Sequence, residues 1–397
     1  INYKKIMSEI KIAIIGCGSI ANIAHLPSIK KTKGLVLEAV CDIDAQRVND
    51  TKSKWKANKS FTDYKEMFQT TDLDAVVIAS PNNWHRNHAV AAAKSKVNVI
   101  VEKPLAITNF EARDIVDACR KNNVKLMVGC DRRFWTHNQW AKTLVDDGII
   151  GNLLMSRASL HEHWFNYQNH VAYTDFRLNC EVAGGAAISD TGAHAIDLLT
   201  WLNNSKVKRV IGIAKRAAMP ESYTLCDDLA ALMMEFENEA HAYVSCNRFS
   251  PAVSQATELY GTEGTIYTTS DSVNPFQSWP MAVYTNKDFN HENYPEILKN
   301  FRWPDLFWVE DIIPEKMRKK WIPICPPRHP SNYEKMTEHY LDCIVNDKEP
   351  LVSGQDGADS IDVMCGVFKS METNSWVDLP LKEEVIPPNY KKIDLEN

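Results

Sequence analysis

The sequence predicts an α/β domain with a doubly wound parallel sheet, followed by an α+β domain with a large, open, mainly antiparallel sheet. Its 397 residues exceed the usual size of a single core, so two domains are expected. In the first third, short β-branched apolar runs alternate with longer amphipathic stretches, as in parallel sheets that helices cover on both faces. Beyond Arg133 the apolar segments follow one another with turns between them, which indicates antiparallel pairing.

The first domain, residues 1–128, is expected to contain five strands joined by helices. Apolar residues recur at helical spacing in Asn83–Lys96 and Thr108–Asn122. Right-handed crossovers between such elements give a doubly wound sheet. The strands are predicted at Lys11–Ile15, Leu35–Cys41, Asp74–Ala79, Val97–Val101 and Lys125–Val128.

The second domain, residues 129–397, begins with a predicted helix at Thr136–Asp147. Helices at Asn332–Val345 and Ala358–Thr373 close the fold and could pack back on the first domain. Between them, the segment 271–330 is rich in proline and tryptophan, which indicates an insertion, a lid or an oligomer contact and not a flexible linker. The strands of this domain are predicted at Leu153–His161, Val207–Ala214, Ala230–Phe236, Ala240–Asn247 and Thr257–Tyr260.

Composition excludes several classes of protein. A net charge of -6 argues against a nucleic-acid-binding role, and no apolar stretch approaches the roughly 20 residues of a membrane span. The ten cysteines are scattered, without metal-ligand spacing, so we expect reduced, buried thiols in a cytoplasmic protein and no metal site. The first apolar segment, Ile10–Ile15, is too short for a signal peptide, and Met7 is a candidate for the natural start.

A glycine-rich turn follows the first predicted strand and opens a helix, which is typical of a Rossmann-type dinucleotide site. Its first glycine allows a tight turn, and its second allows the backbone to approach a pyrophosphate at the helix N-terminus. Contacts with the cofactor are expected from Gly16, Gly18, Ser19, Ile20 and Ala21.

Asp42 ends the second predicted strand, at the position where a carboxylate accepts hydrogen bonds from the adenosine ribose. It would repel a 2′-phosphate, so NAD is favoured over NADP, and the neighbouring Ile43 is included in the site. A helix cap for the helix at Ala45–Val48 is the alternative role of Asp42.

The carboxyl ends of parallel strands meet at one crevice, so residues after the third and fourth apolar runs should also border the cofactor. His85 could contact the nicotinamide side or could be a structural cap. The residues expected at this crevice are Ser80, Pro81, Asn82, His85, Glu102 and Lys103.

Lys103 lies in Glu102-Lys103-Pro104, directly after the buried run at Val97–Val101. Proline restricts the backbone of the residue before it, so the amine leaves the strand end in a limited direction. An exposed lysine before a helix-starting proline is the alternative.

Asp190 and His194 lie four residues apart after a stretch of small residues, at the predicted start of a helix. The helix dipole should keep His194 neutral, as a general base requires. His194 could take the proton of an alcohol while Lys103 polarises the same oxygen, and Asp190 would orient the substrate or the imidazole. A helix cap for Asp190 and a satisfied buried histidine for His194 are the alternatives.

Together these residues resemble the Gfo/Idh/MocA oxidoreductases, which include glucose-fructose oxidoreductase and inositol dehydrogenase. The resemblance covers essentially the whole chain. It depends on Gly16–Ala21, Asp42, Ser80–His85, Glu102–Pro104, Gly129–Phe134, Asp190–His194 and Gly261–Gly264.

The resemblance implies that Lys103, Asp190 and His194 form the catalytic group, with the substrate between the second sheet and the nicotinamide. It also implies a homodimer or homotetramer built on the outer face of that sheet. Two departures concern the substrate: Asp131 replaces a neutral residue found in many members, and the segment 271–330 is longer than usual.

A sugar, glycoside or cyclitol is the expected substrate, since aromatic faces and hydrogen-bond donors suit a polyhydroxylated ring. The alternatives are a keto-sugar reductase, a redox-neutral NAD-dependent glycosidase and, from another class, a non-catalytic NAD-binding regulator. Besides the catalytic group, the residues expected to contact the substrate are Arg132, His163, Trp164 and Arg177.

Overall fold

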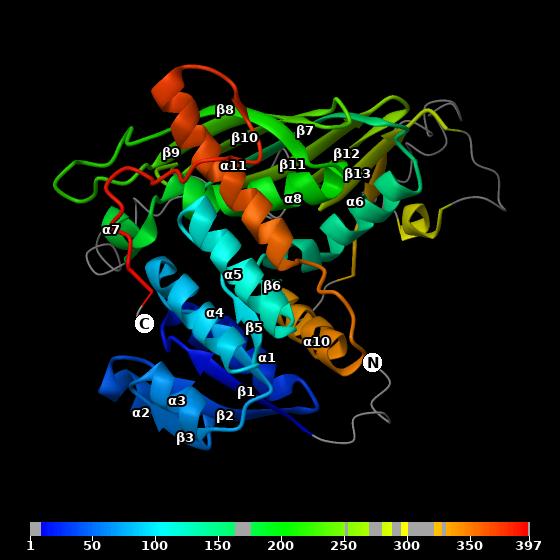
Figure 1. Ribbon diagram of the computed structural model, residues 1–397. Coiled ribbons are helices and arrows are strands. Elements are labelled where there is room, and N and C mark those ends of the chain that lie inside the picture. The colour runs from blue at the N-terminus through cyan, green and yellow to red at the C-terminus, as the bar shows by residue number, and fades with distance from the viewer. Residues whose placement is uncertain are drawn as a thin grey trace.

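The computed structural model describes residues 9–162, 176–250, 253–269, 280–287, 295–300, 321–327 and 331–395. Two sheets dominate it, one in each predicted domain, with helices packed between them (Figure 1). In the described part of the chain, no helix is both long and apolar enough to cross a membrane.

The first sheet has six parallel strands in the order β3-β2-β1-β4-β5-β6. Five strands were predicted and are confirmed; β3 was missed because Lys-Ser-Phe is half-buried and has no apolar run. The strands are β1 (Ile10–Ile15), β2 (Leu35–Cys41), β3 (Lys59–Phe61), β4 (Ala75–Ile78), β5 (Asn98–Val101) and β6 (Leu126–Val128).

Helices surround this sheet, as expected for a doubly wound domain. Thr108 and Glu111 form a reciprocal capping box at the start of α5. Asp44 caps α2 through the Arg47 amide, so the alternative role of Asp42 as a cap is wrong. The helices are α1 (Leu26–Lys31), α2 (Ala45–Trp55), α3 (Tyr64–Thr70), α4 (His85–Lys94) and α5 (Asn109–Asn122).

The second sheet has nine strands in the order β14-β13-β12-β11-β7-β10-β9-β8-β15. Among the described residues of this sheet, only β7 and β10 pair in parallel, so the prediction of a mainly antiparallel sheet is confirmed. The strands are β7 (Leu153–His161), β8 (Val207–Lys215), β9 (Leu229–Phe236), β10 (His241–Asn247), β11 (Ser254–Gly261), β12 (Gly264–Thr269), β13 (Met281–Thr285), β14 (Ile322–Ile324) and β15 (Val377–Asp378).

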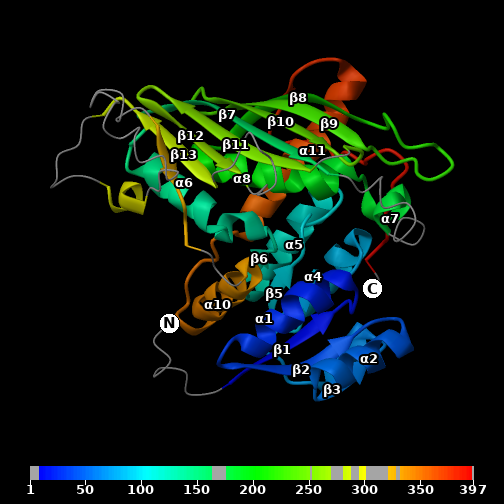
Figure 2. The ribbon, with the colours of Figure 1, turned by 180° about the vertical axis from the view of Figure 1, so that it is seen from behind.

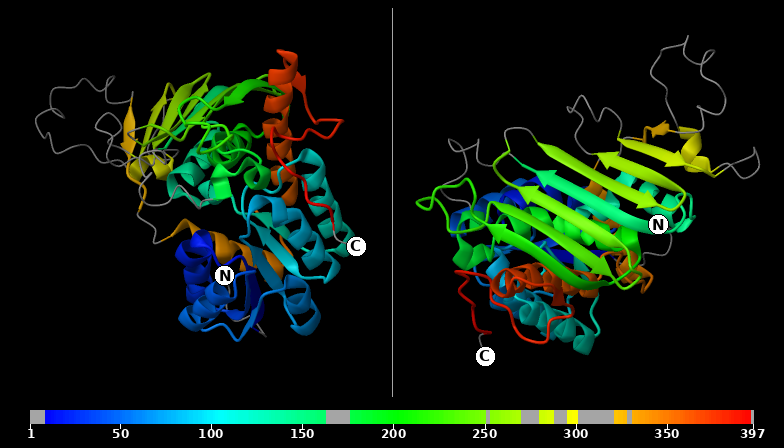
Figure 3. Two further views of the ribbon diagram at one scale, coloured as in Figure 1. Left: turned by 90° about the vertical axis from the view of Figure 1, so that its left-hand side faces the viewer. Right: turned by 90° about the horizontal axis from the view of Figure 1, so that it is seen from above.

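Helices cover the face of the second sheet that points toward the first domain, while its outer face is open in the view from above (Figure 3). The helices on that face are α6 (Thr136–Asp146), α8 (Ala193–Asn203) and α11 (Gly354–Thr373). The other helices of this part of the chain are α7 (Cys180–Ala183) and α10 (Asn332–Val345).

The last two helices return to the first domain. Helix α10 packs on α1, and α11 packs on α5 and β6 (Figures 1 and 2). Helix α11 begins four residues before the predicted Ala358, because Ser353 caps it and Gly354 fits closely over Leu126. A Cβ on Gly354 would lie 2.3 Å from Leu126 Cδ2. The domain boundary near residue 128 stays a prediction.

The segment 271–330 is described only at 280–287, 295–300 and 321–327. Strands β13 and β14 extend the second sheet there, and Trp321 packs against Tyr267 and Tyr284. The other three tryptophans of the segment, Trp279, Trp303 and Trp308, lie outside the described residues.

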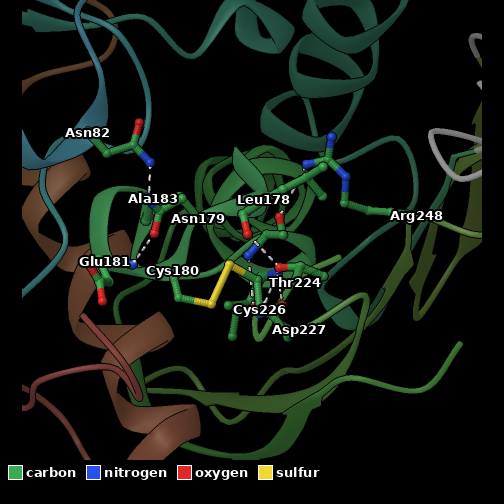
Figure 4. The surroundings of a disulfide bond; sticks show 12 residues. Asn82, Leu178, Asn179, Cys180, Glu181, Ala183, Thr224, Cys226, Asp227 and Arg248 are labelled. Atoms are coloured by element: carbon green, nitrogen blue, oxygen red, sulfur yellow. Dashed lines mark hydrogen bonds between the residues drawn. A yellow bond between two sulfur atoms is a disulfide. The ribbon is translucent and has the colours of Figure 1, made fainter. Parts of the chain in front are cut away.

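One expectation about the cysteines is wrong. Cys180 and Cys226 are joined in a disulfide, although all ten cysteines were expected to be reduced (Figure 4). They are 46 residues apart in sequence, so no local spacing indicated the pair. The other eight cysteines are free, and no cluster of three or more metal-binding side chains occurs in the described residues.

Candidate active site

Lys103 and Asp190 meet between the two domains. The Lys103 ammonium, at the carboxyl end of β5, donates to the Asp190 carboxylate Oδ1 and to its backbone carbonyl at 3.1 Å. Both side chains are largely buried, with 11% and 16% exposed. Lys103 is therefore not the exposed lysine of the alternative interpretation.

The second oxygen of Asp190 is held by arginines. Arg248 Nη1 lies 2.6 Å from Oδ2, and Arg177 Nε lies 3.3 Å from the same atom. Burial opposes the charged carboxylate, but Lys103, Arg248 and Arg177 outweigh it and hold the pKa of Asp190 well below its usual range. Asp190 is thus a fixed carboxylate and makes no helix-cap hydrogen bond.

Asp190 and His194 do not share one regular helix. Asp190 lies in a wide π-type turn, Ala187–Gly192, and His194 lies in the first turn of α8. The segment before Asp190 is anchored by Asp227, whose carboxylate accepts the amides of Ala186 at 2.8 Å and Ile188 at 2.7 Å (Figure 4 includes Asp227). This anchoring directs the Asp190 carboxylate toward Lys103.

His194 is nearly buried, and its pKa is well below the usual value. Burial is the main cause, followed by the positive charges of Lys103 and Arg132. The imidazole is therefore neutral, as predicted, but mainly because of burial and neighbouring cations. Nδ1 has no hydrogen-bond partner in the described structure and lies 3.7 Å from Asp131 Oδ1.

The glycine turn has the shape that a dinucleotide site requires. Gly16 has a φ of +93°, and a Cβ there would lie 2.4 Å from the Ala79 carbonyl oxygen, so only glycine fits. A Cβ on Gly18 would meet no atom within 4 Å, which leaves room for a ligand. Ala21 is fully buried below the turn, and Ser19 is exposed beside Ile20.

Asp42 closes this turn. Its carboxylate accepts the Cys17 amide at 2.8 Å and the Asp44 amide at 3.0 Å. Arg47 Nη1 lies 3.4 Å from Oδ1, while the Ile43 side chain is 93% exposed beside it. The turn and this carboxylate fit the pyrophosphate and ribose of a dinucleotide.

The remaining residues of the predicted crevice make hydrogen bonds with neighbours outside it. Ser80 Oγ lies 3.0 Å from His88 Nδ1, and Asn82 Nδ2 donates to the Ala183 carbonyl of the second domain at 3.0 Å (Figure 4). Glu102 Oε1 lies 2.7 Å from His25 Nε2. Pro81 precedes the short turn Asn82–Trp84.

His85 is fully buried, and its two ring nitrogens each lie 2.9 Å from a backbone carbonyl, that of Pro104 and that of Ser80. Both polar atoms are thereby committed to the backbone. This arrangement corresponds to a structural histidine, one of the two roles weighed from the sequence.

Two of the expected substrate residues border this site. Arg132 Nη2 donates to Gln255 Oε1 at 3.0 Å, and its guanidinium stacks over Trp135. Arg177 reaches Asp190 as described above. His163 and Trp164 lie outside the described residues.

Sequence reasoning missed Arg248 and Asp131 as neighbours of Asp190 and His194. Arg248 follows β10, which packs on the turn that holds Asp190, and this contact is one that no motif indicates. Asp131 was noted only as an unusual residue, although it is the carboxylate near His194.

Comparison with known proteins agrees with this architecture. Residues 10–130 match the family model for an oxidoreductase family with an NAD-binding Rossmann fold, and residues 138–267 match the GFO/IDH/MocA C-terminal domain. The chain belongs to the GFO/IDH/MocA oxidoreductase family, and its first domain is the NAD-binding fold of that family.

Two curated relatives illustrate the range of similarity. A D-apiose dehydrogenase of Paraburkholderia graminis is 25% identical over 391 residues, 96% of this chain and 92% of the relative. A myo-inositol 2-dehydrogenase of Thermotoga maritima is 25% identical over 259 residues, 65% of this chain and 74% of the relative.

Among solved structures, a levoglucosan dehydrogenase in complex with NADH and L-sorbose has a TM-score of 0.78 at 22% identity. The match covers 94% of this chain and 100% of that one. At this identity it is evidence for the fold.

Proposed function

We propose that this protein is an NAD-dependent dehydrogenase that oxidises a secondary hydroxyl of a sugar, glycoside or cyclitol to a ketone. The observation that carries the proposal is the ion pair of Lys103 with Asp190, next to a neutral His194, in a chain of this oxidoreductase family. A cofactor-binding regulator needs the glycine turn but needs neither a fixed ammonium nor a neutral base.

Lys103 polarises the substrate oxygen in this proposal. Asp190 keeps the ammonium in place, and because the carboxylate is held by Arg248 as well, it stays charged and does not carry the proton. His194 accepts the hydroxyl proton as general base. NAD, when bound, supplies the hydride acceptor.

Asp42 supports NAD in preference to NADP. Its carboxylate is fixed by two backbone amides and would repel a phosphate of the same charge at contact distance. Arg47 lies beside it, but half of that side chain is exposed, so it only partly offsets the negative charge.

A polyhydroxylated substrate is supported by the names of the relatives, which act on apiose, inositol and levoglucosan. Arg132 and Arg177 offer hydrogen-bond donors to such a ring.

The test is a substrate panel. Purified protein is incubated with NAD and, separately, with D-apiose, myo-inositol, levoglucosan and common aldoses, and NADH absorbance is followed. We expect NADH formation with at least one compound, and none with Lys103→Met. Absence of NADH with every compound, in a protein that binds NAD, would contradict the proposal.

We also propose that two or four copies assemble through the open face of the second sheet. Ile213 and Tyr243 are exposed there, and a shallow apolar depression of about 400 Å³ lies across β8, β9 and β10. Light scattering after size-exclusion chromatography should give at least twice the 45.1 kDa chain mass. A monomer would rule this out, and Tyr243→Asp should weaken the assembly.

A further inference from the structure

We propose that Asp131 is a positioning residue for His194, holding the Nδ1–H of its imidazole so that Nε2 faces the substrate. The inference rests on the proposed function, in which His194 is the general base. The orienting role therefore moves from one carboxylate to the other. Asp190 pairs with Lys103, and Asp131 is the carboxylate that orients His194.

The two ring nitrogens of His194 have different environments. Nδ1 is buried, has no hydrogen-bond partner in the described structure, and lies 3.7 Å from Asp131 Oδ1. Nε2 makes no hydrogen bond to another described residue, and 15% of the His194 side chain stays exposed. A buried N–H without an acceptor is costly, and Asp131 is the acceptor within reach.

Asp131 is itself held in place. Its Oδ2 accepts the indole N–H of Trp135 at 2.8 Å, which leaves Oδ1 directed toward His194. Asp131 begins the short turn Asp131–Phe134 between β6 and α6, so its backbone is fixed by two regular elements. At 3.7 Å the contact with Nδ1 is longer than a hydrogen bond, as is common for catalytic contacts that tighten in the substrate complex.

Charge gives this placement a consequence for catalysis. Lys103 and Arg132 oppose protonation of His194, and Asp190 favours it. Asp131, whose own pKa is raised by burial, lies 3.7 Å from Nδ1. Asp190 is already neutralised by Lys103 and Arg248. Asp131 is therefore the carboxylate available to stabilise the imidazolium as the proton arrives at Nε2.

The first test needs no activity. In protein with ¹⁵N-labelled histidine, we expect the His194 ring, assigned by its loss in His194→Gln, to be the Nδ1–H tautomer. Asp131→Leu, which has a similar shape but no acceptor, should convert it to the Nε2–H tautomer. Asp117→Leu is the matched control, because it removes a carboxylate that is 73% exposed on α5, and it should keep the Nδ1–H tautomer. An Nε2–H ring in the unmodified protein would overturn the inference.

The second test is kinetic, on the substrate found by the panel. Asp131→Asn should lower kcat by about 10- to 100-fold with little change in KM, less than the loss expected for removal of the base itself. In a His194→Gln background the same change should have less than about a twofold effect, because the residue acts through His194. An equal loss in both backgrounds would overturn the inference. If no compound is oxidised at all, the proposed function fails, while the tautomer measurement still decides the role of Asp131.

Discussion

Lys103 and Asp190 come from different domains and share one ion pair, supplemented by a hydrogen bond from the ammonium to the Asp190 backbone carbonyl at 3.1 Å. Lys103 follows a strand of the parallel sheet, and Asp190 lies in the turn before α8. The candidate site is therefore complete only when the two domains are packed together.

Replacing Lys103 should abolish turnover and spare cofactor binding. Lys103→Met removes the donor to the reacting oxygen, and loss of such a donor costs about 10²- to 10³-fold in kcat. NAD affinity, measured by calorimetry, should change little. Lys121→Met, at the exposed far end of α5, is the control and should keep full activity. Activity retained by Lys103→Met would refute this role.

Arg248 should stabilise the fold through Asp190. Arg248→Met leaves the buried Oδ2 of Asp190 with Arg177 at 3.3 Å and without its closer partner, so the free energy of unfolding should fall by about 1–3 kcal/mol. Arg248→Lys should restore part of it. Urea unfolding of the three proteins measures this, and equal stabilities would show that the pair contributes nothing.

Asp42 should control the choice of cofactor. Asp42→Asn removes the charge that repels a 2′-phosphate, so the preference for NAD over NADP should shrink by about tenfold or more. Titration of each variant with both cofactors measures the ratio. Tighter binding of NADP than NAD by the unmodified protein would exclude the role given to Asp42.

Stability should decline in mild acid because of buried histidines. Burial, aided by His85, lowers the pKa of His88 to about 3 from 6.5. Below pH 6.5 His88 is protonated in the unfolded chain but stays neutral in the folded chain. Its contribution to the free energy of unfolding is therefore complete above pH 6.5 and is lost as the pH falls toward 3.

The slope from one such histidine is about 1.4 kcal/mol per pH unit. In urea unfolding at several pH values between 6.5 and about 4, His88→Gln should show a dependence shallower by that amount. Parallel curves for the two proteins would show that His88 is protonated in the fold.

The disulfide can be counted chemically. Eight thiols should react in denaturant without reductant, and all ten after reduction. Ten reactive thiols without reductant would show that Cys180 and Cys226 are not joined. Disulfides are favoured in oxidising compartments. The expected cytoplasmic location depended on reduced thiols, so the disulfide does not support it, and that location stays a prediction.

The sequence was most informative where local chemistry determines structure. Apolar runs predicted β1, β2 and β4 to β6. The glycine motif predicted a tight turn at Gly16, where the structure has a positive φ and no space for a side chain. Short or half-polar strands such as β3 (Lys59–Phe61) carry too few apolar residues to be recognised.

Contacts across domains could not be predicted in this way. Spacing alone placed Asp190 and His194 on one helical face, whereas the wide turn Ala187–Gly192 turns Asp190 toward Lys103. The contacts of Arg248 and Asp131 arise inside the second domain: β10 packs on the turn Ala187–Gly192, and Asp131 lies in the short turn before α6. No periodicity encodes either contact.

The most direct test of the site is a crystal structure with NAD bound. The account predicts Lys103 Nζ and His194 Nε2 on the same side of the nicotinamide ring, each within about 6 Å of its C4 and separated from it by a substrate-sized gap. A nicotinamide bound elsewhere, with either group farther away or no space between them, would contradict the proposed mechanism.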